Sequence, residues 1–246
     1  MSPLPATSTT SPVLARPEAD PIVRVVGLGR RLGGAWALRR VDFEVQRGRS
    51  MIFFGANGAG KTTLLRVLGT ALRPTVGTVT LFGGSPWDAR SRTSLLSHAD
   101  HHYDELTARE NLRLAVTLGP RPLSADGVDA VLAEVGLTGR ADEPVRGFSA
   151  GMRKRLAFAR LLVKGAELVL LDEPYAQLDP AGHAFVDRLI RRLRAGGSTV
   201  LVSTHQVTRV AALVEDGLLL DHGRVAWVGP AADAPARLPA IREEDT

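Results

Sequence analysis

The sequence predicts an α/β fold built around a parallel sheet, and three observations support this prediction. Two apolar runs, residues 168–171 and Thr199–Ser203, have the length of strands that are buried on both faces. Apolar residues at helical spacing separate them over residues 185–193, which completes a strand–helix–strand unit. Earlier in the chain, the apolar run Ser50–Phe54 is followed by a glycine-rich turn and a helical pattern over Lys61–Leu68.

Composition limits the class of protein. The chain has 246 residues, of which 44% are hydrophobic and 23% are charged, a balance that allows a sizeable core. Its apolar runs are far shorter than the ~20 residues that a membrane helix needs, so we expect the chain not to span a bilayer. The lack of cysteine excludes disulfides and thiolate metal sites and suits a reducing cytoplasm. The net charge of +5 is a modest excess, and no nucleic-acid partner is expected.

The two ends of the chain are predicted to be tails. Residues 1–21 are rich in Pro, Ser and Thr and lack the basic start and apolar stretch of a secretory signal, so we expect a disordered tail. Residues 230–246 are rich in alanine and proline, end in acidic residues, and are also predicted to be a tail. The folded domain is therefore expected over residues 22–229.

Two further regions differ in pattern from the core. Short apolar runs broken by glycines over residues 22–45 predict an N-terminal antiparallel β subdomain. Thr107 and Glu110 form a capping box that starts a helix. Ser124 is expected to cap a second helix, whose apolar positions share one face. An inserted helical subdomain is therefore predicted over about residues 90–160.

The glycine-rich turn after residue 54 carries the phosphate-loop pattern G-x-x-x-x-G-K-[ST], between a predicted strand and a predicted helix. Glycines let backbone N–H groups converge on phosphate oxygens, and the helix N-terminus adds partial positive charge. We expect Lys61 to reach the β- and γ-phosphates of ATP and the Thr62 hydroxyl to ligate Mg²⁺. These residues predict a P-loop NTPase core, in which the nucleotide-binding residues are Gly55, Ala56, Asn57, Gly58, Ala59, Gly60, Lys61, Thr62 and Thr63.

Polar residues follow the two later strands. Asp172 and Glu173 end the apolar run at 168–171, and strand alternation points their side chains in different directions. Asp172 is expected to hold Mg²⁺ through water, and Glu173 to polarise the water that attacks the γ-phosphate. His205 ends the next strand, where the carboxyl ends of parallel strands gather around ligands, and is expected to sense the γ-phosphate.

A further motif lies upstream of these acids. Phe148-Ser149-Ala150-Gly151-Met152, followed by basic residues and an alanine-rich helix, resembles the LSGGQ signature of ABC ATPases. Asp179 matches the D-loop of that family, and His205 matches its switch histidine. The resemblance as a whole covers residues 22–229. It implies that Ser149, Gly151 and Asp179 of one subunit close on the nucleotide of another. The active species would be a homodimer or a pair with another ABC subunit.

The chain departs from the family pattern at two positions. Ala99 takes the place of the Q-loop glutamine, which in the family contacts Mg²⁺, the attacking water and the membrane partner. Leu32 takes the place of the aromatic residue that stacks on adenine, although Trp36 is close enough in sequence to substitute. Two other groups of residues each have a minor alternative. A metal cluster is the alternative for His98, Asp100, His101, His102 and Asp104. A lipid-binding helix face is the alternative for Arg188, Arg191, Arg192 and Arg194.

The resemblance implies an ATP-hydrolysing subunit that drives separate membrane-spanning transporter subunits from the cytoplasmic face of the cell membrane. Three short segments are similar to the haem exporter subunit of bacterial cytochrome c maturation: Leu96-Ser97-His98, Ser149-Ala150-Gly151 and Thr204-His205-Gln206. Two alternatives stay open. One is a soluble ABC ATPase that acts on ribosomes or DNA, and the other is a regulatory module that hydrolyses ATP weakly.

Overall fold

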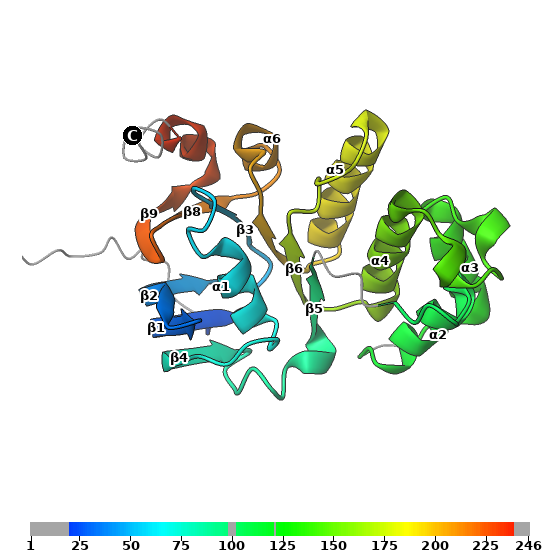
Figure 1. The fold of residues 1–246 in the computed structure, drawn as a ribbon, viewed down its shortest axis with the longest axis horizontal. Coiled ribbons are helices and arrows are strands. Elements are labelled where there is room, and N and C mark those ends of the chain that lie inside the picture. Colours follow the sequence, from blue (N-terminus) through cyan, green and yellow to red (C-terminus); the bar gives the residue numbers. More distant parts are fainter. Residues whose placement is uncertain (1–19, 98–101, 121, 239–246) are drawn as a thin grey trace, which may run out of the picture.

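The computed structural model describes residues 20–97, 102–120 and 122–238, and a six-stranded sheet lies at its centre (Figure 1). The strand order is β5-β6-β7-β3-β8-β9, and every neighbouring pair is parallel except β8 and β9. The strands are β3 (Ser50–Phe54), β5 (Thr93–Leu96), β6 (Leu168–Asp172), β7 (Thr199–Ser203), β8 (Asp216–Asp221) and β9 (Arg224–Pro230). The predicted parallel sheet is therefore confirmed.

The central strands supply two hydrophobic cores, one on each face of the sheet. Leu168 and Leu170 of β6 pack with α1 (Lys61–Leu68) and the smaller sheet. Val169 and Leu171 pack on the other face with α4 (Ala150–Lys164), α5 (Pro180–Ala195) and α6 (Val207–Ala211). Because side chains alternate along a strand, all five residues of β6 are buried.

The smaller sheet is three-stranded and antiparallel, in the order β2-β1-β4, which confirms the prediction for the N-terminal region. Along β2 (Ala35–Val45), Val41 and Phe43 are buried, while Asp42 is exposed. Phe43 meets Phe53 of the large sheet edge to face, with ring centroids 5.6 Å apart. The two other strands are β1 (Val23–Leu32) and β4 (Val76–Leu81).

Three helices gather at the end of the molecule opposite the smaller sheet (Figure 1). They are α2 (Ala108–Thr117), α3 (Ala125–Glu134) and α4 (Ala150–Lys164), and they share a third hydrophobic core. Both predicted caps are present. The Thr107 hydroxyl accepts from Glu110 N at 3.1 Å, Thr107 N donates to Glu110 Oε2 at 2.8 Å, and Ser124 Oγ accepts from Gly127 N at 3.2 Å.

The structure differs from the sequence prediction in four elements. Thr93–Leu96, predicted within the helical region, is strand β5 and pairs with β6. Four residues are too few to show whether a pattern is that of a helix or a strand. Residues 231–237, predicted as part of a tail, form a 3-10 helix whose Ala231 and Ala234 are buried. Strands β8 and β9 were not predicted, and the remaining tail residues, 1–19 and 239–246, lie outside the described chain.

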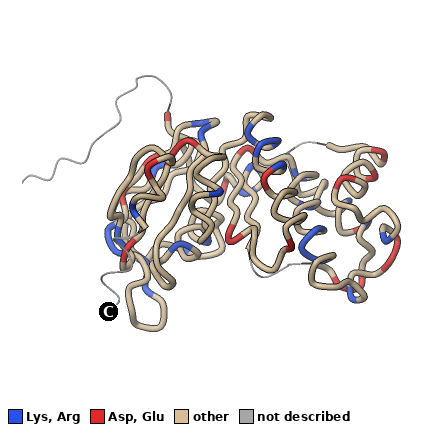
Figure 2. The backbone as a smooth tube through the Cα atoms, turned by 90° about the horizontal axis from the view of Figure 1, so that it is seen from above, with Lys and Arg blue, Asp and Glu red and all other residues tan. Residues whose placement is uncertain are grey.

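Charged residues of both signs are interspersed along the described chain (Figure 2). On α5, Arg188 and Arg191 are exposed, as predicted for a solvated helix face. Arg192 instead contacts Glu134 of α3, and Arg194 contacts Glu215. In the part of the chain that the structure describes, no helix combines the length and apolar character needed to cross a membrane.

A carboxylate at the start of β6 joins two arginines that are distant in sequence. Glu167 accepts from Arg92 Nε at 2.6 Å and from Arg47 Nη1 at 2.7 Å. The Arg92 guanidinium also lies 3.8 Å from the ring centre of Phe82. The bond from Arg92, and then that from Arg47, holds the pKa of Glu167 below its ordinary value. Glu167 therefore stabilises the contact between β5, β6 and the turn before β3 only while it is ionised.

We expect Glu167→Gln to lower the free energy of unfolding by about 1 kcal/mol at neutral pH, because a partly exposed charged hydrogen bond is lost. A depressed carboxyl pKa contributes stability above its unfolded value, and this contribution is lost as pH falls through the folded value. The difference between variant and wild type should therefore shrink in acid. Urea unfolding at several pH values measures it, with the exposed Glu143→Gln as control. A difference that stays constant with pH would contradict this role for Glu167.

Candidate active site

The loop after β3 follows a path that requires glycine. Gly55, Gly58 and Gly60 have φ of +144°, +79° and +106°, values that residues with a side chain rarely adopt. A Cβ on Gly60 would lie 2.6 Å from the carbonyl oxygen of Ala37, and one on Gly55 would lie 2.0 Å from that of Leu220. The loop is therefore pressed against neighbouring backbone, and α1 begins directly after it at Lys61.

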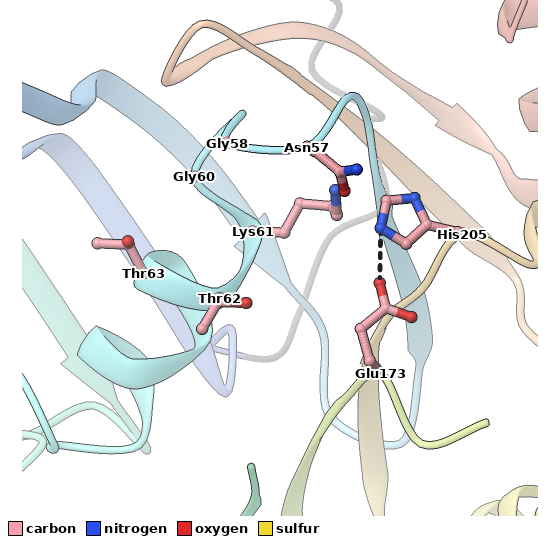
Figure 3. Close-up of a pocket in the computed structure, with 8 residues that line it drawn as sticks. All are labelled: Asn57, Gly58, Gly60, Lys61, Thr62, Thr63, Glu173 and His205. Atoms are coloured by element: carbon pink, nitrogen blue, oxygen red, sulfur yellow. Dashed lines mark ion pairs between the residues drawn. The ribbon is translucent and has the colours of Figure 1, made fainter. Parts of the chain in front are cut away.

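A cavity of about 250 Å³ opens beside this loop (Figure 3). Its walls come from the carboxyl ends of three parallel strands, β3, β6 and β7, with β7 between the other two. Ligands bind at such edges in open α/β sheets. The lining residues are Asn57, Gly58, Gly60, Lys61, Thr62, Thr63, Glu173 and His205.

Lys61 is the cation of the cavity, and it is buried. Its Nζ donates to the carbonyl oxygens of Gly55 and Ala56, each at 2.8 Å, so the chain folds back over its own loop. Burial lowers the pKa of Lys61, and the charges of Glu173 and Asp172 oppose that shift. The ammonium group thus lies against two carbonyl oxygens in a partly desolvated place, where a ligand anion would interact with it strongly.

Asp172 lies beneath the cavity and accepts two hydroxyl groups. Thr62 Oγ1 donates to Asp172 Oδ1 at 3.0 Å, and Ser203 Oγ donates to the same atom at 2.5 Å. Asp172 Oδ2 is buried and has no hydrogen-bond partner among the described residues. A hydroxyl beside a buried carboxylate with an unsatisfied oxygen is a donor set that fits Mg²⁺, which prefers oxygen ligands. The two predicted metal ligands are therefore brought together, although they lie far apart in the sequence.

Glu173 and His205 face each other across the cavity (Figure 3). Glu173 Oε1 lies 3.3 Å from His205 Nε2 but makes no well-oriented hydrogen bond, so the contact is an ion pair only when the histidine is protonated. Glu173 has φ +47°, a strained value for a residue with a side chain. Its backbone N–H donates to the carbonyl oxygen of Ser203 at 3.0 Å, which ties the acid to the end of β7.

Of the predicted site residues, Gly55, Ala56, Ala59 and Asp172 adjoin lining residues without lining the cavity themselves. Three others, Ser149, Gly151 and Asp179, are also outside the lining. Ser149 and Gly151 are exposed, and the Ser149 hydroxyl caps α4 by accepting from Met152 N at 3.3 Å. Asp179 is also exposed and caps α5, accepting from Gly182 N at 2.7 Å. Their expected role needs a second subunit, and it stays a prediction.

Neither Leu32 nor Trp36, the two positions considered for stacking on adenine, is among the residues that line the cavity. The Trp36 ring covers Gly29, where an added Cβ would lie 2.8 Å from the ring, and the Arg31 guanidinium lies 5.4 Å from the ring centre. Leu32 is 41% exposed. The use of Trp36 as an adenine platform therefore stays a prediction.

The predicted Q-loop position and most of the proposed histidine cluster cannot be placed. Ala99, His98, Asp100 and His101 lie outside the described residues. His102 is described, and its Nε2 lies 2.9 Å from the carbonyl oxygen of Arg153 in α4. No group of three or more metal-binding acids and histidines was found in residues 20–97, 102–120 and 122–238.

Sequence analysis did not single out Ser203, which contacts both acids. Its hydroxyl binds Asp172, and its carbonyl accepts from Glu173 N. Ser203 stands opposite Asp172 in the register of β6 and β7. A serine that ends an apolar strand just before His205 was the available signal.

The glycine geometry gives a direct test. We expect Gly58→Ala to cost about 1 kcal/mol of stability, because only the positive φ is strained. Gly60→Ala should cost about 2–3 kcal/mol, since its methyl group also meets the backbone of Ala37. Chemical unfolding of both variants measures the difference. Equal losses would show that the close approach to Ala37 is not rigid.

The chain is similar to known proteins over most of its length. The family model described as ABC transporter matches residues 38–176. The phosphonates import ATP-binding protein PhnC of Anaeromyxobacter dehalogenans is 37% identical over 89% of this chain. The match covers 47% of PhnC, so this chain spans about half the length of that relative.

Two further matches extend over most of both partners. The cytochrome c biogenesis ATP-binding export protein CcmA of Nitrosococcus oceani is 37% identical over 79% of this chain and 90% of its own length. A solved structure described as an ATP binding subunit of an ABC transporter superposes with a TM-score of 0.79 at 26% identity. That match covers 90% of this chain and 94% of the other.

Proposed function

Because the chain belongs to the ABC transporter family of ATP-binding domains and is an ATPase of that family, we propose that it hydrolyses ATP at the cavity beside Lys61 to drive transport through separate membrane subunits. One observation carries this proposal. Lys61, Thr62 and Glu173 line a single cavity at the ends of neighbouring parallel strands, and Asp172 is hydrogen-bonded to Thr62 beside it.

Binding of the triphosphate would use the loop from Gly55 to Thr63. Backbone N–H groups of the loop and the start of α1 face the phosphates, and Lys61 Nζ exchanges its two carbonyl partners for phosphate oxygens. Thr62 and Asp172 would hold Mg²⁺, which neutralises charge on the β- and γ-phosphates when bound. Asn57 stands at the exposed rim of the loop.

Hydrolysis would use Glu173 as the general base. A water oxygen attacks the γ-phosphorus as the bond from that phosphorus to the bridging oxygen breaks, and the proton of the water passes to the Glu173 carboxylate. The products are ADP and inorganic phosphate. His205, 3.3 Å from Glu173 Oε1, holds the carboxylate in place and contacts the γ-phosphate when the nucleotide is bound.

We also propose that the complete site forms between two chains arranged head to tail. Ser149, Gly151 and Asp179 are exposed in the single chain, which leaves them accessible to a nucleotide held by a partner. Ser149 and the first amides of α4 offer the partially positive end of a fifteen-residue helix to that nucleotide. The partner is a second copy of this chain or another ABC subunit.

Separate membrane-spanning subunits would supply the transport pathway, with this chain on the cytoplasmic face of the cell membrane. The finer proposal for the cargo is haem, exported for cytochrome c maturation. It is supported by the match to CcmA and by the Ser149-Ala150-Gly151 form of the signature. The phosphonate relative carries the name of an import protein, so the direction of transport is part of what experiment tests.

Two substitutions separate binding from chemistry. We expect Lys61→Ala to weaken binding of Mg-ATP by about 100-fold or more, because the buried phosphate partner is lost. Glu173→Gln should keep the affinity for ATP but lower kcat by about 100-fold or more and accumulate an ATP-bound dimer. Calorimetry, phosphate release and light scattering measure these effects, with the exposed Arg66→Ala on the same helix as control. Unchanged turnover in Glu173→Gln would remove this residue from its role.

The membrane partner can be identified directly. We expect the tagged chain, purified from gently solubilised membranes of its own cells, to retain integral membrane proteins that stimulate its ATPase activity. Haem bound by those proteins supports the finer proposal. Recovery with ribosomes or DNA instead, and stimulation by them, would favour the soluble alternative and contradict the transport role.

A further inference from the structure

A partly buried hydrogen-bond network joins segments next to the cavity-lining residues Glu173 and His205 and includes none of the residues assigned to catalysis above. The Tyr175 hydroxyl donates to Asp187 Oδ1 at 2.8 Å. Arg209 binds the same carboxylate with two nitrogens, Nε at 3.0 Å from Oδ1 and Nη2 at 2.9 Å from Oδ2. The network thus joins the segment after β6, the middle of α5 and the short helix α6.

Each outer member of this network is close in sequence to one residue of the proposed catalytic pair. Tyr175 stands two positions after Glu173, within a turn closed by a bond from Ala176 N to the Glu173 carbonyl at 3.1 Å. Arg209 lies four positions after His205, in a helix whose first turn is closed by a bond from Val210 N to the Gln206 carbonyl at 3.1 Å. Asp187 therefore connects the two loops that place Glu173 and His205.

Tyr175 is fixed on more than one side. Its side chain is only 2% exposed. The ring of His183, one turn before Asp187 on α5, meets the Tyr175 ring edge to face with centroids 5.5 Å apart. His183 Nε2 also lies 3.2 Å from the Tyr175 carbonyl oxygen. Both the backbone and the side chain of Tyr175 are thus held by α5.

The protonation states of Asp187, Tyr175 and Arg209 determine which groups of the network donate hydrogen bonds and which accept them. Burial opposes ionisation of Asp187, but the bonds from Arg209 and Tyr175 outweigh it and hold the pKa of Asp187 below its ordinary value. Burial, together with the bond to Asp187, raises the pKa of the Tyr175 phenol. Around neutral pH the carboxylate is therefore an acceptor, and the phenol and the guanidinium are donors.

We propose that Asp187 is a positioning residue for ATP hydrolysis, which holds the turn of Tyr175 and the helix of Arg209 so that Glu173 and His205 stay in contact. The proposal rests on the function proposed above for Glu173. It explains how Glu173 keeps its strained φ of +47°, since such a conformation persists only where the surrounding structure fixes it. We expect binding of ATP not to involve Asp187, because its hydrogen-bond partners among the described residues, Tyr175 and Arg209, belong neither to the phosphate loop nor to α1.

A role in positioning predicts a loss of rate without a loss of binding. We expect Asp187→Asn and Tyr175→Phe each to lower kcat by about tenfold, because small displacements of a catalytic group are costly, while KM and the affinity for ATP change by less than about twofold. Asp142→Asn is a matched control. Asp142 also receives two nitrogens of one arginine, Arg109, but on the helical subdomain, so its variant should keep the wild-type kcat.

The effect should also depend on His205. In a His205→Ala background, which already lacks the contact with Glu173, we expect Asp187→Asn to lower kcat by less than about twofold further. A merely structural role would instead reduce kcat by the same factor in both backgrounds, in parallel with thermal stability. Arg209→Lys, which keeps the charge but not the two-nitrogen fork, should fall between wild type and Asp187→Asn in kcat.

The outcomes separate this proposal from the proposed function. A wild-type chain without magnesium-dependent ATPase activity would refute the function itself. If Glu173→Gln is inactive while Asp187→Asn and Tyr175→Phe turn over like wild type, the role of Asp187 is refuted and that of Glu173 stands. Equal loss of kcat in both His205 backgrounds also overturns the proposal. If Asp187→Asn does not fold, Tyr175→Phe, which keeps the packed ring, decides the question by the same measurements.

Discussion

Burial of both faces of the central sheet is the constraint on which the rest of this molecule depends. Strands β3, β6 and β7 have no residue that faces solvent, so most of their side chains are apolar. Among the polar ones, Thr199, Ser203 and Asp172 are hydrogen-bonded to neighbours. Charged groups enter only where these strands end. Because the strands are parallel, their ends meet at one edge, and the phosphate loop, the two acids and His205 lie there together.

The same burial sets the electrostatics of the cavity. Lys61 and Asp172 have little contact with water. The lysine donates to two carbonyl oxygens, and one carboxylate oxygen of the acid accepts from two hydroxyl groups while the other has no partner among the described residues. Opposite charges in such a place act on one another more strongly than on the surface. A triphosphate with its cation would replace these internal partners at little cost in reorganisation, which is how a preorganised site acts.

The single chain holds only part of the proposed machinery. The phosphate loop and Glu173 face one cavity, while Ser149, Gly151 and Asp179 are exposed. Ser149 and Asp179 are nevertheless ordered by capping α4 and α5. A surface that is fixed in position before it meets its partner loses less conformational entropy on association. The α5 helix contributes to both proposals, since Asp179 caps its first turn and Asp187 lies in its interior.

The sequence by itself determined the local elements and the chemistry of the phosphate loop. These features depend on residues that are close to one another in the chain, so the sequence alone is enough to recognise them. They are the glycine spacing, the capping box at Thr107, and the acids that follow an apolar run. The tertiary structure alone decided that residues 93–96 form a strand, because a segment of only four residues takes its conformation from the strand beside it. It also decided the contacts of Ser203 with Asp172 and of Asp187 with Tyr175 and Arg209, which join different elements. Such contacts arise from the packing of strands and helices, and no spacing along the sequence records them.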